Sequence, residues 1–187
     1  MMDDIVVIDV ETTGLDSDTN EIIGVSSVLL QSHKVTGLKY ETWCNAPQKF
    51  DKVALDIIGK EIGFFEDQPS LSDTINNLTD FINGRRLVAL NPSFGSSFLC
   101  KAGLSTDIKI EDALNIVRKN LEGFAPYDKE DFRWSDWKNG PLQRVLPCRH
   151  HLDDDFDTML IGKFLEISFN GSLRAQLENT RACGQSS

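Results

Sequence analysis

Near its N-terminus the chain reads Ile5-Val6-Val7-Ile8-Asp9-Val10-Glu11-Thr12-Thr13-Gly14. The β-branched run at the start of this stretch is typical of a buried strand, and the Thr-Thr-Gly at its end is a turn signal. Asp9 interrupts the apolar run, where a carboxylate without compensation is costly. Because side chains alternate along a strand, Asp9 and Glu11 point to the same face.

Two interpretations of this acidic pair remain open from the residues alone. Neighbouring carboxylates form a site of hard oxygen donors that suits Mg²⁺ or Mn²⁺, and a bound cation would explain an acid inside an apolar strand. The alternative is that Asp9 and Glu11 cap the turn beside Thr12 and Thr13. An Asp-x-Glu pair is common, so the pair by itself does not decide between them.

Further strands and helices follow the first strand. Residues 22–30 form a second apolar run, and apolar and polar side chains alternate over 38–44. Three strands with short connections predict an antiparallel meander. A capping box at Ser70 and helical spacing predict a helix over 71–82 that ends at Gly84. Residues 87–90 then read as a buried strand, which is reached through a helix and is therefore expected to be parallel to its neighbour.

The second half of the chain is mainly helical in pattern. We predict helices over 94–104, 114–121 and 155–167, a brief strand at 108–110, and an irregular insert over 123–148. These elements predict an α/β fold with helices flanking a mixed sheet. A single domain spans 1–178 in this prediction, and 179–187 form a flexible tail.

Composition limits the classes of partner. The chain has 187 residues, with 29 Asp and Glu against 19 Lys and Arg, so its formal net charge is −10. This charge argues against a broad grip on nucleic acid phosphates, which needs clustered Lys and Arg. An acidic N-terminus unlike a signal peptide, and the lack of an apolar run of membrane-spanning length, predict a cytoplasmic protein without a membrane partner.

A second chemical element lies far along the chain, where His150-His151-Leu152-Asp153-Asp154-Asp155 precedes the last predicted helix. A histidine at this place can act as a general base at neutral pH, next to a metal-bound water. The alternative is an exposed histidine pair before a solvated helix N-terminus, which the acidic residues cap favourably.

Together these segments resemble the DnaQ-like 3′-5′ exonucleases, the DEDD superfamily on the RNase H-like fold. Residues 8–15, followed by Glu21-Ile22-Ile23, resemble the first motif, and 87–95 resemble the second. His150 and Asp155, five residues apart, match the third motif of the histidine subtype. The resemblance covers about residues 4–167 and implies one exonuclease-like domain, with a three-strand antiparallel meander plus parallel strands flanked by helices.

The resemblance implies a two-metal site that holds Mg²⁺ or Mn²⁺. Asp9 would bridge both ions, and Glu11 and Asp155 would hold the ion that activates water. His150 would be the base that removes a proton from this water, with His151 as the second choice because it lacks the five-residue spacing.

It also implies how a strand end is bound. The backbone around Thr12 and Thr13 would receive the terminal 3′-hydroxyl, and Leu15 would pack on the last base. Asn91, in the second motif, is a further expected substrate-binding residue.

The second motif departs from the family at one place. The family has an aspartate after the phenylalanine of this motif, and here that place is Gly95, which has no ligand atom. The loss is expected to weaken the second metal and the stabilisation of the leaving oxygen. Three accounts fit: an inactivated variant, a natural protein that binds ends without cutting, or replacement by another acid such as Asp107 or Asp153.

The expected function is therefore that of a metal-dependent 3′-5′ exonuclease that removes nucleoside monophosphates from a DNA 3′ end and is impaired by Gly95. Single-stranded DNA is expected ahead of RNA, although nothing in the sequence reads the 2′-hydroxyl. A polymerase or another nucleic-acid-processing protein is the expected partner. The alternative is an inactive module that binds nucleic acid 3′ ends or a protein.

Overall fold

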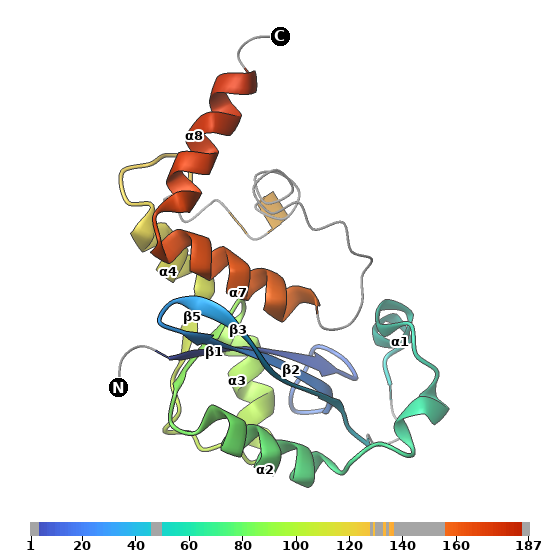
Figure 1. Ribbon diagram of the computed structural model, residues 1–187. Coiled ribbons are helices and arrows are strands. Elements are labelled where there is room, and N and C mark those ends of the chain that lie inside the picture. Colours follow the sequence, from blue (N-terminus) through green and yellow to red (C-terminus); the bar gives the residue numbers. More distant parts are fainter. Residues whose placement is uncertain are drawn as a thin grey trace.

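The structure is a computed structural model, shown in Figure 1. It describes residues 4–45, 50–127, 129, 133, 135–136 and 156–184. Four residues to which the sequence analysis gave possible roles lie outside the described residues: His150, His151, Asp153 and Asp155. Most of the predicted insert at 123–148 lies outside them as well.

A five-stranded mixed sheet forms the centre of the fold. Its strands are β1 (Ile5–Thr12), β2 (Ile22–Gln31), β3 (Lys34–Trp43), β4 (Arg86–Ala89) and β5 (Ile110–Asp112), in the spatial order β3-β2-β1-β4-β5. The first three strands are antiparallel, whereas β4 is parallel to β1 and β5 is parallel to β4. The predicted meander and the predicted parallel strand are confirmed, and β5 begins two residues later than the strand predicted at 108–110.

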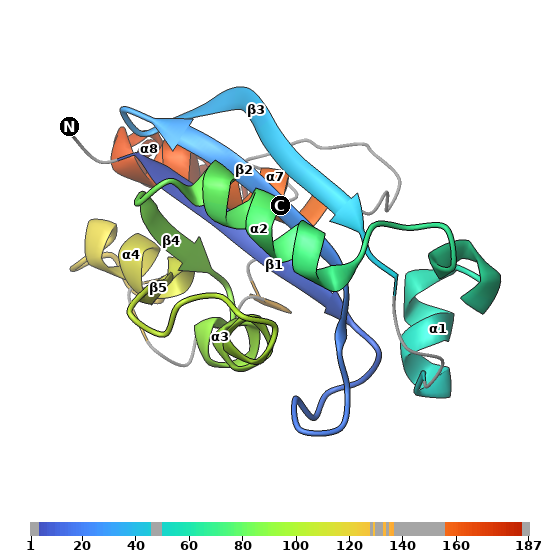
Figure 2. The same ribbon diagram turned by 90° about the horizontal axis from the view of Figure 1, so that it is seen from below.

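Helices cover both faces of this sheet (Figures 1 and 2). They are α1 (Lys52–Ile58), α2 (Leu71–Ile82), α3 (Pro92–Lys101), α4 (Ala113–Asn120), α7 (Phe156–Phe169) and α8 (Ser172–Gly184), with a short 3₁₀ helix, η1 (Ile62–Phe65). The predicted cap of α2 is present, because Ser70 Oγ accepts from Asp73 N at 3.0 Å. At its other end Asn83 and Gly84 have left-handed backbone with φ of +42° and +71°, which ends the helix.

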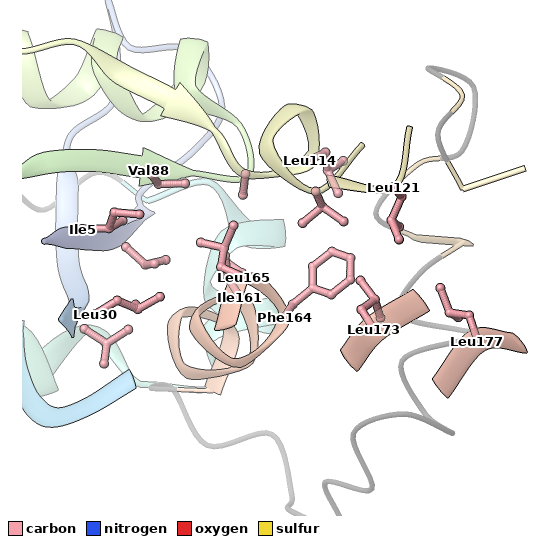
Figure 3. Packing of buried hydrophobic residues seen from close by; sticks show 14 of the residues in the cluster. Ile5, Leu30, Val88, Leu114, Leu121, Ile161, Phe164, Leu165, Leu173 and Leu177 are labelled. Atoms are coloured by element: carbon pink, nitrogen blue, oxygen red, sulfur yellow. The ribbon is translucent and has the colours of Figure 1, made fainter. Parts of the chain in front are cut away.

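Alternation along β1 separates two apolar cores. Ile5 and Val7 pack with α4, α7 and α8, and Figure 3 shows Phe164 and Ile161 of α7 at the centre of this cluster. The alternate residues, Val6 and Ile8, pack on the opposite side with α2 and α3. Side chains two apart share a face, so the odd-numbered row of β1 continues towards its C-terminal end on the α7 side.

The last helix, α8, was not predicted from the sequence. Its Leu173 and Leu177 are fully buried in the same core as α7, and the helix continues to Gly184. The segment 179–187, predicted as a loose tail, therefore begins as helix, and its flexibility stays a prediction. None of the helices in the described part of the chain has the length and hydropathy needed to cross a membrane.

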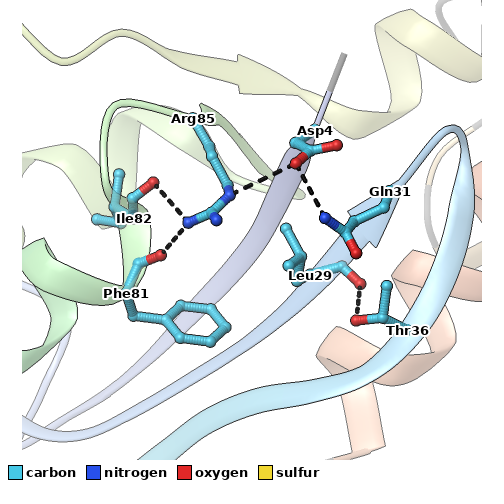
Figure 4. A network of polar contacts seen from close by, with 7 residues as sticks. All are labelled: Asp4, Leu29, Gln31, Thr36, Phe81, Ile82 and Arg85. Atoms are coloured by element: carbon cyan, nitrogen blue, oxygen red, sulfur yellow. Dashed lines mark hydrogen bonds and ion pairs between the residues drawn. The ribbon is translucent and has the colours of Figure 1, made fainter. Parts of the chain in front are cut away.

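Arg85 fastens the end of α2 to the first strand (Figure 4). Its Nη1 donates to the carbonyl oxygens of Phe81 at 2.9 Å and Ile82 at 3.5 Å, where α2 leaves its last carbonyls without helical partners. Its Nε lies 3.7 Å from Asp4 Oδ2, which also accepts from Gln31 Nε2 at 3.2 Å. One guanidinium thus joins α2 to the ends of β1 and β2, immediately before β4 begins.

The short β4–β5 pair carries an ion pair that predicts a pH effect. Arg86 Nε and Nη2 donate to the two carboxylate oxygens of Glu111 at 2.8 and 3.0 Å, and these bonds lower the pKa of Glu111. We expect Arg86→Met to lower the free energy of unfolding by less than about 1 kcal/mol at pH 7, because the pair is partly exposed.

A lowered folded-state pKa gives stability that is present above the ordinary carboxyl pKa and is lost as the pH falls through the lowered value. Urea unfolding at neutral and at acid pH should therefore show that the free energies of unfolding of the parent and of Arg86→Met become equal in acid. A difference that persists in acid would mean that Arg86 acts through packing instead of charge.

Candidate active site

Asp9 and Glu11 lie on the α7 side of the sheet, half-buried near the C-terminal end of β1. Asp9 Oδ1 accepts from Val10 N at 3.0 Å. The pairing register of β1 with β2 shifts directly after the acidic pair, since Glu11 pairs with Gly24 and Thr12 with Ile22. Irregularities of this kind are common next to active sites. The structure thus places both predicted acids on one face, as expected from the sequence.

The second-motif segment reaches Asp9 from α3. A cavity of about 20 Å³ is lined by Asp9, Asn91 and Gly95, together with Ile8, Val10, Ala89, Phe94, Leu99 and Ile110. Asn91 is the N-cap of α3, since its Oδ1 accepts from Phe94 N at 3.3 Å. The cap explains why the chain turns at this point and brings position 95 to the same cavity as Asp9.

The start of α7 approaches the same place from the other side. Ser26 is the cross-strand partner of Asp9, and its hydroxyl lies 2.6 Å from the hydroxyl of Thr158 in the first turn of α7. Residues directly opposite each other in an antiparallel pair are side-by-side neighbours. The first turn of α7 is therefore bonded to the cross-strand neighbour of Asp9. The residues before α7 that resemble a third motif lie outside the described part of the chain.

Position 95 has room for a side chain. Gly95 is buried in α3, and a Cβ added there would meet no heavy atom within 4 Å. Asp107, a possible replacement acid, is exposed in the loop after α3 and does not line this cavity; its backbone N–H is 3.3 Å from Ser105 Oγ. Among the residues that the structure describes, no three His, Cys, Asp or Glu side chains gather into a possible metal site.

A larger cleft of about 610 Å³ opens beside Glu11. Its lining is mostly apolar and comprises Val10, Glu11, Thr12, Gly14, Leu15, Asp51, Val53, Ala54, Ile57, Ile58 and Phe94. Leu15 on one wall and Ile57 on the other are 85% and 77% exposed. Exposed apolar side chains around a cleft mark binding surfaces, and this one ends at a carboxylate.

One wall of this cleft, helix α1, was not predicted from the sequence. Its residues Val53, Ala54 and Ile57 nevertheless have the spacing of one helix face. Phe94 was also missed as a site residue; it lines both the large cleft and the small cavity, and it packs on Phe98 with ring centroids 4.9 Å apart.

The two threonines after β1 differ in their surroundings. Thr12 lines the cleft, and its Oγ1 donates to the carbonyl of Gly14 at 2.7 Å. Thr13 is only 1% exposed; its backbone N–H donates to Glu21 at 2.9 Å and its carbonyl accepts from Asp51 N at 2.8 Å. Thr13 therefore supports the loop from inside, and of the two only Thr12 faces the cleft.

Gly24 permits a close approach that positions Glu11. It stands opposite both Glu11 and Trp43 in the sheet. A Cβ at Gly24 would lie 2.9 Å from Trp43 Cε3 and 3.2 Å from Glu11 Cβ, and these distances are too short for ordinary contact.

We therefore expect Gly24→Ala to lower the free energy of unfolding by about 1–3 kcal/mol, through overpacking. Gly37→Ala in β3 is the matched control, because a Cβ there meets nothing within 4 Å. Urea unfolding checks both variants. Equal stability of Gly24→Ala and Gly37→Ala would show that the Trp43 ring yields without cost.

Residues 6–120 match the family model described as Exonuclease, which covers more than half of the sequence. The chain belongs to the exonuclease family. This confirms, at the level of the family, the resemblance drawn from the motifs.

Relatives of this exonuclease-family chain include replication proteins. It is 30% identical over 190 residues to the DNA polymerase III PolC-type protein of Bacillus subtilis, which covers 97% of the chain and 13% of that protein. It is 27% identical over 132 residues to DNA polymerase III subunit epsilon of Salmonella typhimurium, with 63% and 54% covered. The chain thus spans about half of the epsilon subunits and about a tenth of the PolC-type proteins that it matches.

Solved structures share the fold of the exonuclease-family chain at low identity. Exonuclease X in complex with 5′ overhanging duplex DNA has a TM-score of 0.65 at 20% identity, with 90% of this chain and 92% of that chain covered. Escherichia coli exonuclease I in complex with a dT13 oligonucleotide has a TM-score of 0.66 at 12% identity, with 96% and 43% covered. These likenesses confirm the RNase H-like fold.

Proposed function

We propose that the chain is a metal-dependent 3′-5′ exonuclease of the histidine subtype, and that Gly95 impairs this form. One observation carries the proposal: β1, the start of α3 and the start of α7 converge on Asp9. These are the segments that hold or directly follow the three motifs. Convergence of distant segments on one acid is typical of a site built for chemistry, and the turn-capping alternative does not account for it.

The donor set suits one divalent ion better than two. Asp9 and Glu11 supply hard oxygen donors on one face of β1, and Asp155 would complete the set from the N-terminal end of α7. The ligand expected for a second ion is missing at Gly95. When bound, Mg²⁺ or Mn²⁺ would supply Lewis-acid chemistry, lowering the pKa of water and polarising the phosphate.

The side chains of the protein would bind and orient the strand end. The 610 Å³ cleft would hold the last base between Leu15 and Ile57, because stacking and apolar contact tolerate any base. Thr12, which lines the cleft next to Glu11, would place the terminal sugar near that carboxylate. His150 would accept the proton of the attacking water at an imidazole nitrogen, with His151 as the second choice.

Single-stranded DNA is the proposed substrate, ahead of RNA. Two similar structures, exonuclease X and exonuclease I, are complexes with DNA, and the sequence relatives are DNA polymerase III proteins. The net charge of −10 limits the protein to a short strand end, so tight binding would need a partner such as a polymerase. We propose a cytoplasmic location, because the sequence relatives are DNA polymerase III proteins.

A shortening assay tests this function directly. Short single-stranded DNA and RNA carrying a 5′ label are incubated with the protein in Mg²⁺ and in Mn²⁺, and products are separated by length. We expect slow stepwise shortening from the 3′ end of DNA, with release of nucleoside monophosphates and none from a 3′-phosphorylated strand. Internal cuts, or equal loss from blocked ends, would contradict the proposal.

The second candidate is an inactive module that binds 3′ ends. The absence of a ligand atom at Gly95, with no replacement acid among the described residues around it, favours this candidate. It predicts tighter binding of a free 3′-hydroxyl end than of a 3′-phosphorylated end, without shortening under any metal condition. Equal binding of both ends would exclude it.

A further inference from the structure

Lys101, in the last turn of α3, binds the loop between β1 and β2. Its Nζ donates to three backbone carbonyl oxygens of this loop, those of Ser17 at 2.6 Å, Asn20 at 3.0 Å and Asp18 at 3.3 Å. An ammonium group has three donors, so the three acceptors match its full capacity. The residue is more than 80 positions away in sequence, and no motif points to it.

The loop that Lys101 binds is the one that presents Leu15. Asn20 is buried and organises the loop from inside, since its Nδ2 donates to Asp16 O at 3.0 Å and its Oδ1 accepts from Thr13 Oγ1 at 3.2 Å. Leu15 instead projects from the loop at the rim of the large cleft. Without an external hold, carbonyls on the outer side of such a loop would face only water.

We propose that Lys101 is a positioning residue that fixes the β1–β2 loop against α3, so that Leu15 meets the strand end as a preformed wedge. The inference rests on the proposed function, because it assumes that Leu15 packs on the last base. An ordered loop avoids the entropy cost of ordering on binding, which is how preorganisation improves affinity. Lys101 also joins this loop to α3, the helix that carries position 95.

The alternative role for Lys101 is general: a cation in the last turn of a helix interacts favourably with the helix dipole. Lys119 has this role without the loop, because it is exposed in the last turn of α4. Lys119→Met is therefore the matched control for Lys101→Met, with the same charge lost at a helix C-terminus.

The test has a binding arm and a loop arm, both on the full chain. Affinity for a short fluorescent oligothymidylate with a free 3′-hydroxyl is measured in Ca²⁺, and hydrogen exchange is followed by mass spectrometry over residues 13–21. We expect Lys101→Met to weaken binding on the order of tenfold and to speed exchange in the loop, with an unchanged melting temperature. Lys119→Met should change neither readout, and Lys101→Arg should restore part of both.

A double variant separates positioning from direct contact. If Lys101 acts through Leu15, Lys101→Met should add nothing to the loss caused by Leu15→Ala. Additive losses would mean that Lys101 touches the strand itself and would overturn the proposal. Unchanged hydrogen exchange over residues 13–21 in Lys101→Met would also overturn it. If the parent protein does not prefer a free 3′ end at all, the proposed function fails, and the exchange arm still decides whether Lys101 holds the loop.

Discussion

Gly95→Asp is expected to raise the rate of 3′-end shortening on the order of 100-fold or more. The change would restore a carboxylate next to Asp9, in the cavity that both positions line. Removal of a single group that stabilises charge in a transition state commonly costs this much, so its return should recover it. The structure accommodates the side chain, because no heavy atom lies within 4 Å of the added Cβ.

The matched control is Gly95→Asn, which has nearly the same shape and no charge. Both replacements relieve the helix-propensity cost of glycine. Without metal, Gly95→Asp should still be less stable than Gly95→Asn, because its buried carboxylate lies beside Asp9. Mg²⁺ should raise the melting temperature of Gly95→Asp more than that of the parent, since a ligand that binds only the folded state stabilises it. Equal activity of the Asp and Asn variants would show that position 95 does not hold a metal.

Asp9→Asn, made in the Gly95→Asp protein, is expected to reduce the shortening rate by a factor on the order of 1,000 or more. Asp9 is the point on which the three segments converge, and an amide cannot replace a bridging carboxylate. In the absence of metal the same change should leave stability unchanged or raise it. It removes a half-buried charge two residues from Glu11, and such charges are costly in an apolar strand.

Asp80→Asn, on the exposed surface of α2, is the control that loses an acid away from the site. Shortening assays and thermal unfolding, each with and without Mg²⁺, compare Gly95→Asp alone with its Asp9→Asn and Asp80→Asn derivatives. Full activity of the Asp9→Asn variant would refute the site assignment. A large loss of stability without metal would mean that Asp9 is a structural residue, as the turn-capping interpretation holds.

Local patterns in the sequence were enough to predict most of the sheet. The β-branched run of β1, the alternation in β3 and the cap at Ser70 are local signals, and the structure confirms the elements that they predicted. The parallel direction of β4 also followed, because a helix between two strands leaves a parallel return as the favoured connection. Its pairing with β1 was not predicted. Helix α1 was missed because its seven residues are too few to establish a helical period.

The acids and the altered position were likewise visible in the sequence, since they belong to short motifs. Asp9 and Glu11 share a face simply because a strand has a period of two. What no pattern gave was the neighbours that these residues acquire across the fold. Lys101, Trp43 and Thr158 come near the first motif through packing of elements far away in the chain.

The sequence by itself determined the order of the strands and of most helices, the family resemblance and the missing acid at Gly95. It could do so because propensity, period and motif spacing are properties of neighbouring residues. The tertiary structure alone decided that α3 lines a cavity with Asp9 and that α7 bonds to the strand neighbour of Asp9. It also decided that α1 walls a cleft beside Glu11 and that Gly95 has space for the side chain it lacks. These contacts depend on which faces of the sheet are buried and on how closely the helices pack there, and side-chain volume and burial fix both across the whole molecule.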